Sequence, residues 1–177
     1  MKEKRLQSKT IYEGRIFDLL VDEVELPSGR RTTREVVMHR GAVGLIAVLD
    51  DGRIILEEQY RYATGEVLVE IPAGRLEERE NPESTAKREL LEETGYTADE
   101  LEGVLTFYTT PGYTSEKLYL FLARGLKKEE TKPDFDENIG LLEVPVDDAL
   151  RMIEKGEIRD GKTIVALLYY KRLMPSD

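Results

Sequence analysis

Carboxylates crowd into one short stretch of the chain, residues 74–96, which reads GRLEERENPESTAKRELLEETGY. Two of them, Glu89 and Glu93, fall on one edge of a predicted helix, because successive residues turn by about 100°. They border the side that carries Ala86 and Leu90, which such a helix would bury. Like charges at this spacing repel, and partly buried carboxylates without partners are unfavourable. The pattern therefore indicates a site that gathers a hard divalent cation such as Mg²⁺, which takes oxygen ligands.

The ends of this helix are also marked in the sequence. Asn81 is the predicted N-cap and Pro82 the first helical residue. Gly95 is the predicted stop, where the backbone needs left-handed geometry. Arg88 and Glu92 are expected to pair one turn apart and to offset part of the repulsion. A solvated acidic helix face is the alternative, and it leaves the arginine and the glycines at fixed offsets unexplained.

Composition excludes several classes of partner. A chain of 177 residues fits one domain, or one domain with a small extension. Its formal charge of −10 argues against nucleic acid or a membrane surface as an electrostatic partner. No apolar stretch is long enough for a membrane span or a signal core, so a cytoplasmic protein is expected.

The residue types that the chain lacks reduce the number of possible catalytic mechanisms further. The absence of cysteine excludes disulfides, thiolate metal sites and cysteine nucleophiles. His39 is the only histidine, and no G-x-S-x-G motif accompanies it, so a serine–histidine triad is disfavoured. Acid–base chemistry is left to carboxylates, acting with a metal that lowers the pKa of water.

Periodicity predicts a mixed α+β chain. Residues 16–38 alternate in polarity on both sides of Pro27-Ser28-Gly29 and are expected to form a hairpin. Polar residues 127–138 are expected to form a loop. Further strands are predicted at 43–49, 53–60, 67–71, 104–109, 117–123 and 141–144, and further helices at 147–155 and 163–173.

The defined positions of residues 74–96 resemble the Nudix box, the motif of a hydrolase family. The match comprises Gly74, Glu80, Arg88-Glu89-Leu90, Glu92-Glu93 and Gly95-Tyr96. The resemblance implies an α+β fold, namely the α/β/α Nudix sandwich, here with a small N-terminal antiparallel sheet. It also implies hydrolysis of a nucleoside diphosphate that is linked to another moiety.

The resemblance further implies a set of metal ligands. Glu89, Glu93 and the backbone carbonyl of Ala73 would bind Mg²⁺, with Mn²⁺ as a substitute. Glu92 would join through water, while Arg88 would orient the glutamates with Glu80 as its partner.

The general base of such enzymes often lies in the loop after the sheet. Here that loop offers Asp134, Asp136 and Glu137. Glu137 is preferred, as base or as a further metal ligand, from its distance to the strand at 141–144. Phe135 interrupts the acidic run and leaves the division of roles open.

Two segments resemble the ADP-ribose pyrophosphatase subgroup. The first is the loop 110–116, in which Pro111 lies 15 residues beyond Tyr96 and Glu116 would contact a ribose. The second comprises residues 58–61 and 70–74, whose Arg61 would contact phosphate and whose Glu70 would also lie in the substrate site. The implied reaction converts ADP-ribose to AMP and ribose 5-phosphate.

The N-terminal segment is expected to be distinct, with residues 1–40 forming an extension and 41–177 the Nudix hydrolase domain. In related enzymes such an extension contacts the substrate and forms a homodimer. The resemblance implies that Arg34 stacks on adenine, that Glu35 accepts a hydrogen bond from its amine, and that Ile16 packs on the other face. The chain has no tryptophan, so its adenine pocket must differ from those that use one.

Two alternatives stay open from the sequence. The substrate, a small molecule in either case, could be another nucleotide sugar or nucleoside diphosphate derivative. A non-catalytic module that binds ADP-ribose is the other alternative, although such modules usually lack a box glutamate and none is missing here.

Overall fold

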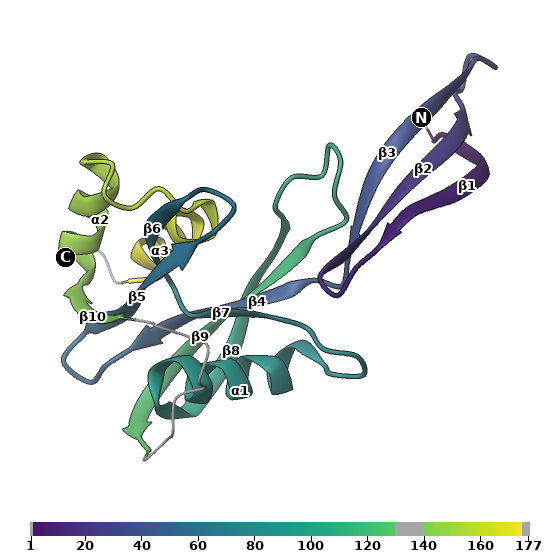
Figure 1. The fold of residues 1–177 in the computed structure, drawn as a ribbon. Coiled ribbons are helices and arrows are strands. Elements are labelled where there is room, and N and C mark those ends of the chain that lie inside the picture. The colour runs from purple at the N-terminus through teal and green to yellow at the C-terminus, as the bar shows by residue number, and fades with distance from the viewer. Residues whose placement is uncertain (1, 130–139, 175–177) are drawn as a thin grey trace. The chain divides into compact units, whose positions relative to one another are not determined.

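The computed structural model describes residues 2–129 and 140–174 (Figure 1). The chain divides into two units. The N-terminal unit comprises residues 1–41 and 107–118, and the larger unit comprises residues 42–106 and 119–177.

The N-terminal unit contains a three-stranded antiparallel sheet in the order β1-β2-β3. Its strands are β1 (Lys4–Glu13), β2 (Phe17–Glu25) and β3 (Arg31–His39). The predicted hairpin is confirmed: the Gly29 amide donates to the Leu26 carbonyl at 2.8 Å, and Gly29 has a φ of 80°. Only glycine adopts that conformation without strain. β1 was not predicted as a strand, because every one of its ten residues is exposed and no buried face marks it.

The larger unit is built on a seven-stranded sheet. Its main path runs in the order β10-β5-β4-β9-β8, while β6 pairs with β5 and β7 pairs with β4. The strands are β4 (Ala42–Val48), β5 (Arg53–Arg61), β6 (Glu66–Glu70), β7 (Ala73–Arg75), β8 (Tyr96–Tyr108), β9 (Lys117–Lys128) and β10 (Gly140–Pro145).

Helices cover both faces of this sheet, so the predicted α/β/α sandwich is confirmed (Figure 1). On one face, Leu45 of β4 packs in a cluster with Ala86 and Leu90 of α1 (Pro82–Thr94). On the other, Ile46 packs in a cluster with Leu167 of α3 (Gly161–Leu173) and with residues of α2 (Val146–Glu154). Every residue of β4 is buried, as expected for a strand that is covered on both sides.

The strands differ from the prediction by more than two residues at two places, and β7 was not predicted as a strand. β8 begins at Tyr96, directly after α1, and not near residue 104. It is an edge strand with exposed acidic residues, which weakens the alternation that a sequence pattern relies on. β9 continues to Lys128, so the first residues of the predicted loop 127–138 are in a strand. Residues 130–138 of that loop lie outside the described residues.

In the described ranges, no helix has the length and apolar character that crossing a membrane requires.

Helix α1 begins and ends where the sequence predicted. Asn81 Oδ1 accepts from the Ser84 amide at 2.8 Å, and Ser84 Oγ accepts from the Asn81 amide at 3.2 Å. Gly95 ends the helix with a φ of 72°, and its amide donates to Leu91 at 2.9 Å. These bonds satisfy amide and carbonyl groups that a helix end otherwise leaves open.

We therefore expect Asn81→Ala to lower the free energy of unfolding by about 1 kcal/mol, the usual effect of losing an N-cap. Urea unfolding followed by circular dichroism measures it. Asn81→Asp keeps the acceptor oxygen and is the matched control. A midpoint of Asn81→Ala equal to that of the wild type would show that the cap does not stabilise α1.

Candidate active site

Glu89 lies directly against the main chain of β7. A Cβ atom added to Gly74 would lie 1.8 Å from both Cδ and Oε1 of Glu89. That separation is far below van der Waals contact, so any other residue at position 74 would push the carboxylate away. Glu89 is buried, with 9% of its surface exposed. The glycine at the start of the motif is thus explained by the close approach of this side chain.

Glu93, one turn along α1, reaches the adjacent residue of β7. Its Oε2 accepts a hydrogen bond from the Ala73 amide at 2.8 Å. Glu89 and Glu93 therefore both border the short segment Ala73-Gly74, and the carbonyl of Ala73 belongs to the same segment. The structure brings together the three groups that the sequence proposed as metal ligands.

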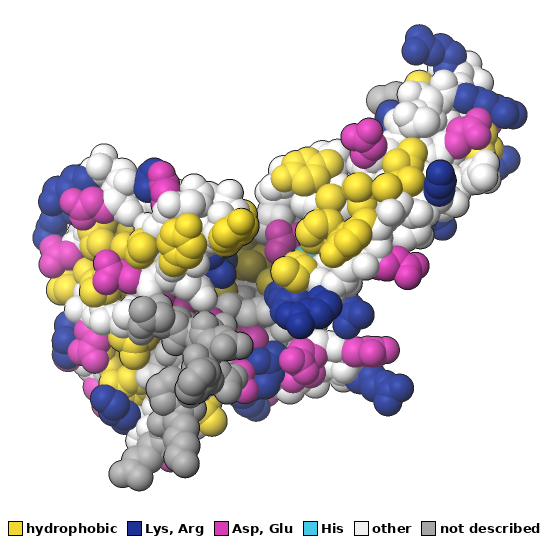
Figure 2. Space-filling view, in the orientation of Figure 1, with side chains coloured by type: hydrophobic (Ala, Val, Ile, Leu, Met, Phe, Trp, Pro, Cys, Tyr) yellow, Lys and Arg dark blue, Asp and Glu magenta, His cyan; other side chains and the backbone are white. Residues whose placement is uncertain are grey.

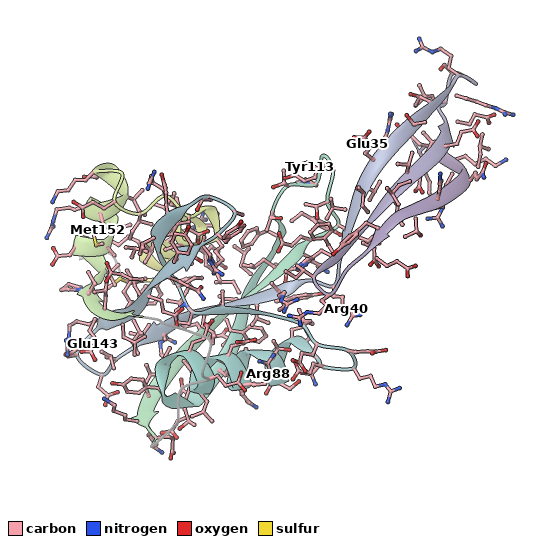
Figure 3. All side chains as sticks on the ribbon, viewed as in Figure 1. Glu35, Arg40, Arg88, Tyr113, Glu143 and Met152 are labelled. Carbon is pink, nitrogen blue, oxygen red and sulfur yellow. The ribbon has the colours of Figure 1, made fainter. Side chains whose placement is uncertain are left out.

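Arg88 connects three carboxylates around this segment; Figure 3 labels it on α1. Its Nη1 lies 2.8 Å from Glu89 Oε1 and 2.8 Å from Glu92 Oε2. Its Nε and Nη2 donate to the two oxygens of Glu80 at 3.1 Å each. The predicted ion pair with Glu92 and the predicted partnership with Glu80 are confirmed. One guanidinium thus fixes the orientation of Glu89.

Interactions within this cluster shift the pKa values of Glu80 and Arg88. Hydrogen bonds from Arg88 and from Thr85 lower the pKa of Glu80 to about 2. The hydrogen bonds that Arg88 donates to Glu80 and Glu92 raise the pKa of its guanidinium well above the ordinary range. Glu80 and Arg88 are therefore both charged at neutral pH.

The donor groups around Ala73 suit a hard cation. Across residues 2–129 and 140–174, no three acidic or histidine side chains form a complete metal site on their own. The donors present are oxygens, from two carboxylates and one main-chain carbonyl. Mg²⁺ usually takes one or two carboxylates, keeps several waters and shares the substrate's phosphate oxygens. The residues therefore fit such an ion.

Two more carboxylates are buried in the sheet of the larger unit. Glu57 of β5 and Glu70 of β6 are each 2% exposed and lie directly opposite each other in the strand register. Glu57 lies on the same face as Ile55, which packs in the cluster with α1. Glu57 was not among the predicted site residues. A charged residue that ends the apolar run 54–56 was the signal that could have identified it.

Arg61 and Glu70, both predicted substrate contacts, bind each other. Arg61 Nε and Nη2 donate to the two Glu70 oxygens at 2.8 Å and 2.7 Å. Lys162 Nζ also donates to Glu70. Burial raises the pKa of Glu70, but the hydrogen bonds from Arg61 and Lys162 outweigh it and hold the pKa below its ordinary value. Glu70 is therefore a buried, ionised carboxylate that is contacted by two cations.

Glu116, the predicted ribose contact, lies in the N-terminal unit beside the only histidine. Thr109 Oγ1 donates to Glu116 Oε2 at 2.7 Å, and His39 Nδ1 lies 3.7 Å from Glu116 Oε1. The Gly41 amide donates to the same Nδ1 at 3.0 Å.

The loop that carries Pro111 is attached to β3. The Val37 amide donates to the Tyr113 carbonyl at 2.8 Å, and the Ser115 amide donates to the Val37 carbonyl at 3.0 Å. Figure 3 labels Tyr113 in this loop and Glu35 on β3.

The residues predicted to surround adenine do not come together within one chain. Arg34 pairs in register with Asp22, whereas Ile16 precedes Asp22 by six residues, which is about 20 Å along a strand. Arg34 and Glu35 are neighbours in β3 and point to opposite faces. Arg34 also binds Glu3, with Nη2 at 2.7 Å from Oε1. One chain therefore does not bring Ile16 and Arg34 together, and the arrangement around adenine stays a prediction.

The general base was predicted in the segment before β10. Glu137, like its alternatives Asp134 and Asp136, lies outside the described residues.

Comparisons with known proteins agree with this geometry. Residues 38–167 match the NUDIX domain, and residues 3–37 match the nucleoside diphosphate sugar hydrolase N-terminal domain. The chain is 45% identical to an ADP-ribose pyrophosphatase of Bacillus subtilis, over 96% of this chain and 92% of that protein. It is 43% identical to a methanol dehydrogenase activator of Bacillus methanolicus, over 95% and 92%.

A solved structure shows the same fold. The crystal structure of an ADP compounds hydrolase superposes with a TM-score of 0.86 and covers 98% of this chain and 94% of that chain. The sequence identity is 24%, so this likeness supports the fold alone.

Gly74→Ala tests the close approach of Glu89 to β7. Because the added methyl group would displace Glu89, we expect Mn²⁺ to bind on the order of 10- to 100-fold more weakly, as when the support of a metal ligand is removed. Isothermal titration calorimetry measures the affinity. Gly103→Ala is the control, since its Cβ would meet Phe121 at an ordinary 3.5 Å. Equal affinities in both variants would exclude a metal at Glu89.

The pKa of Glu80 gives a second test. We expect its carboxyl to titrate near 2 and, in Arg88→Gln, to move back toward its ordinary value near 4.5. Because folding depresses this pKa, the contribution of the pair to stability is present above pH 4.5 and is lost as the pH falls toward about 2. An NMR titration of the glutamate carboxyls measures both variants. An ordinary pKa in the wild type would contradict the pairing.

Proposed function

This chain belongs to the NUDIX family, and from that premise we propose that it hydrolyses ADP-ribose at its pyrophosphate, giving AMP and ribose 5-phosphate. In this reaction water adds to one phosphorus, the bridging P–O bond breaks, and the other phosphate leaves. One observation supports the proposal: two carboxylates of α1 border a single main-chain segment, Ala73-Gly74, whose Ala73 carbonyl would supply a third oxygen.

The proposed cofactor is Mg²⁺, with Mn²⁺ as a substitute. The ligands would be Glu89, Glu93 and the Ala73 carbonyl. When bound, the ion supplies positive charge for the pyrophosphate and lowers the pKa of a water molecule. A chain of net charge −10 needs such a counter-charge in order to bind an anionic substrate. Arg88 orients Glu89 by direct contact, and Glu92 acts through Arg88 and water.

The proposed base is Glu137, with Asp134 and Asp136 as the alternatives. All three precede β10, which begins at Gly140 and pairs with β5 through Glu58. Glu57 and Glu58 are neighbours on β5, so the chain enters the sheet next to one of the buried carboxylates described above. This supports the choice of the segment, and mutation decides among its members.

Substrate recognition is proposed for Arg61, Glu70 and Glu116. Arg61 would contact a phosphate, while Glu70 holds the guanidinium in place through its two hydrogen bonds. Glu116, attached to Thr109, would contact a ribose. Another nucleotide sugar is the alternative substrate. The name of the B. methanolicus relative describes an effect on another enzyme, so it does not discriminate among substrates.

We also propose a homodimer that forms through the N-terminal sheet. This sheet exposes large apolar side chains, as Figure 2 shows, among them Ile11, Tyr12, Ile16 and Phe17. Since one chain does not bring Ile16 near Arg34, a second copy would have to supply one side of the adenine site. A cytoplasmic location stays a prediction from composition.

Hydrolysis of a substrate panel tests the proposal. The panel contains ADP-ribose, GDP-mannose, UDP-glucose, diadenosine polyphosphates and NADH, first with Mg²⁺ and then with chelator. We expect ADP-ribose to have the highest kcat/KM and the chelator to abolish turnover. A different leading substrate would contradict the ADP-ribose assignment, and no turnover of any member would favour a binding module.

Glu93→Gln keeps the size of the side chain and removes its charge. We expect kcat to fall by more than the roughly 10- to 100-fold that outer-shell changes produce. Steady-state hydrolysis of ADP-ribose at saturating Mg²⁺ measures it. Glu83→Gln is the matched control on the same helix, since Glu83 is exposed and pairs with Lys87. A rate for Glu93→Gln close to that of the control would remove Glu93 from the site.

Glu137→Gln tests the proposed base. We expect kcat to fall by about 10² to 10⁴, the usual contribution of general base catalysis. The pH dependence of kcat should lose its acidic limb in the same variant. A loss below about tenfold would move the role to Asp134 or Asp136, whose amide variants are measured in parallel.

A further inference from the structure

The start of α3 contributes a partly buried charged group, Lys162, that the proposed reaction has not used. Lys162 Nζ donates to Glu70 and, at 3.1 Å, to Asp160 Oδ2. The side chain of Lys162 is only 16% exposed and that of Glu70 2%. A lysine this deep is normally retained because a carboxylate requires it.

The same helix start holds the chain just before Ala73. The Ile71 amide donates to Thr163 Oγ1 at 2.9 Å, and Thr163 Oγ1 donates to Asp160 Oδ2 at 2.6 Å. Asp160 is also the N-cap of α3, accepting from the Thr163 amide at 2.9 Å. Asp160 and Thr163 therefore connect α3 to Ile71, two residues before the candidate ligand carbonyl.

Arg61 shares Glu70 with Lys162. The Glu70 hydrogen bond raises the pKa of Arg61, and the charges of Glu93 and Asp160 add to the effect. Arg61 thus lies in the field of Glu93, a candidate metal ligand. This group contains two cations, Arg61 and Lys162, and two carboxylates, Glu70 and Asp160. Its net charge is therefore zero. Among the described residues, Nη1 of Arg61 donates no hydrogen bond within this group.

We propose that Lys162 is a positioning residue for substrate binding, and that Asp160 and Thr163 position Ala73. This inference rests on the proposed function. Glu70 is too buried to stay ionised without cations. Because Lys162 supplies one of the two, Arg61 keeps an N–H group directed away from Glu70 and available to an anionic phosphate. Without Lys162, Glu70 alone would draw the guanidinium inward.

Lys162→Met removes the charge and keeps much of the side-chain volume. We expect KM for ADP-ribose to rise about tenfold per folded enzyme, while kcat changes less, since ground-state binding is affected. Lys162→Arg should restore most of the loss. Lys171→Met is the matched control, because it is the same substitution in the same helix and breaks an exposed pair with Asp147.

A double-mutant cycle distinguishes positioning from packing. If Lys162 acts through Glu70, Lys162→Met should raise KM no further when Glu70 is already glutamine. In the double variant, residue 70 is a neutral glutamine, so no buried carboxylate loses its cation. This removes the main reason for Lys162→Met alone to unfold. Additive effects on KM would overturn the proposal.

Thr163→Val tests the second half of the proposal. It removes the hydroxyl that accepts from Ile71, whereas Thr163→Ser keeps it. We expect the Mg²⁺ concentration for half-maximal activity to rise on the order of tenfold in the valine variant only. Melting curves establish the folded fraction of each variant.

Lower thermal stability with an unchanged KM and Mg²⁺ requirement per folded enzyme would show that the network is purely structural, and the inference would be wrong. A wild-type enzyme that hydrolyses no nucleotide would instead contradict the proposed function.

Discussion

The structure of the larger unit depends on how closely α1 packs against β7. Ala86 and Leu90 are buried against β4, and this places the adjoining edge of α1 on the main chain at Ala73 and Gly74. Glu89 then reaches a position where no side chain at residue 74 would fit. The apolar packing of the helix therefore supplies the free energy that holds two like charges near one segment, an arrangement that electrostatics alone would oppose.

Charge balance around the site is local. The chain as a whole carries −10, yet four carboxylates around the site, Glu70, Glu80, Glu89 and Glu92, each have a cation in direct contact. Arg88 contacts Glu80, Glu89 and Glu92, while Arg61 and Lys162 share Glu70. Arg61 and Arg88 hold Glu70 and Glu80 through bidentate pairs, which fix the planes of these two carboxylates. Such pairs hold the charged groups around the site in a fixed orientation before a metal ion and a substrate bind.

Local signals made α1 and its candidate ligands predictable from the sequence. The Asn81 cap, the Gly95 stop and the one-turn spacing of Glu89 and Glu93 all act within a few residues. β1 and the start of β8 were missed because exposed edge strands carry little alternation. Lys162 and Thr163 were missed because their partners, Glu70 and Ile71, lie more than 90 residues earlier in the chain. Strand register, which separates Ile16 from Arg34 along the N-terminal sheet, is likewise not visible in the local sequence.

The most direct test of the central claim is a crystal structure with Mg²⁺ and an ADP-ribose analogue in which a methylene group replaces the bridging oxygen. The account predicts metal density bounded by the carboxylates of Glu89 and Glu93 and the carbonyl of Ala73, with phosphate oxygens completing the coordination. Metal and pyrophosphate bound elsewhere, with Glu89 and Glu93 unchanged against β7, would contradict it.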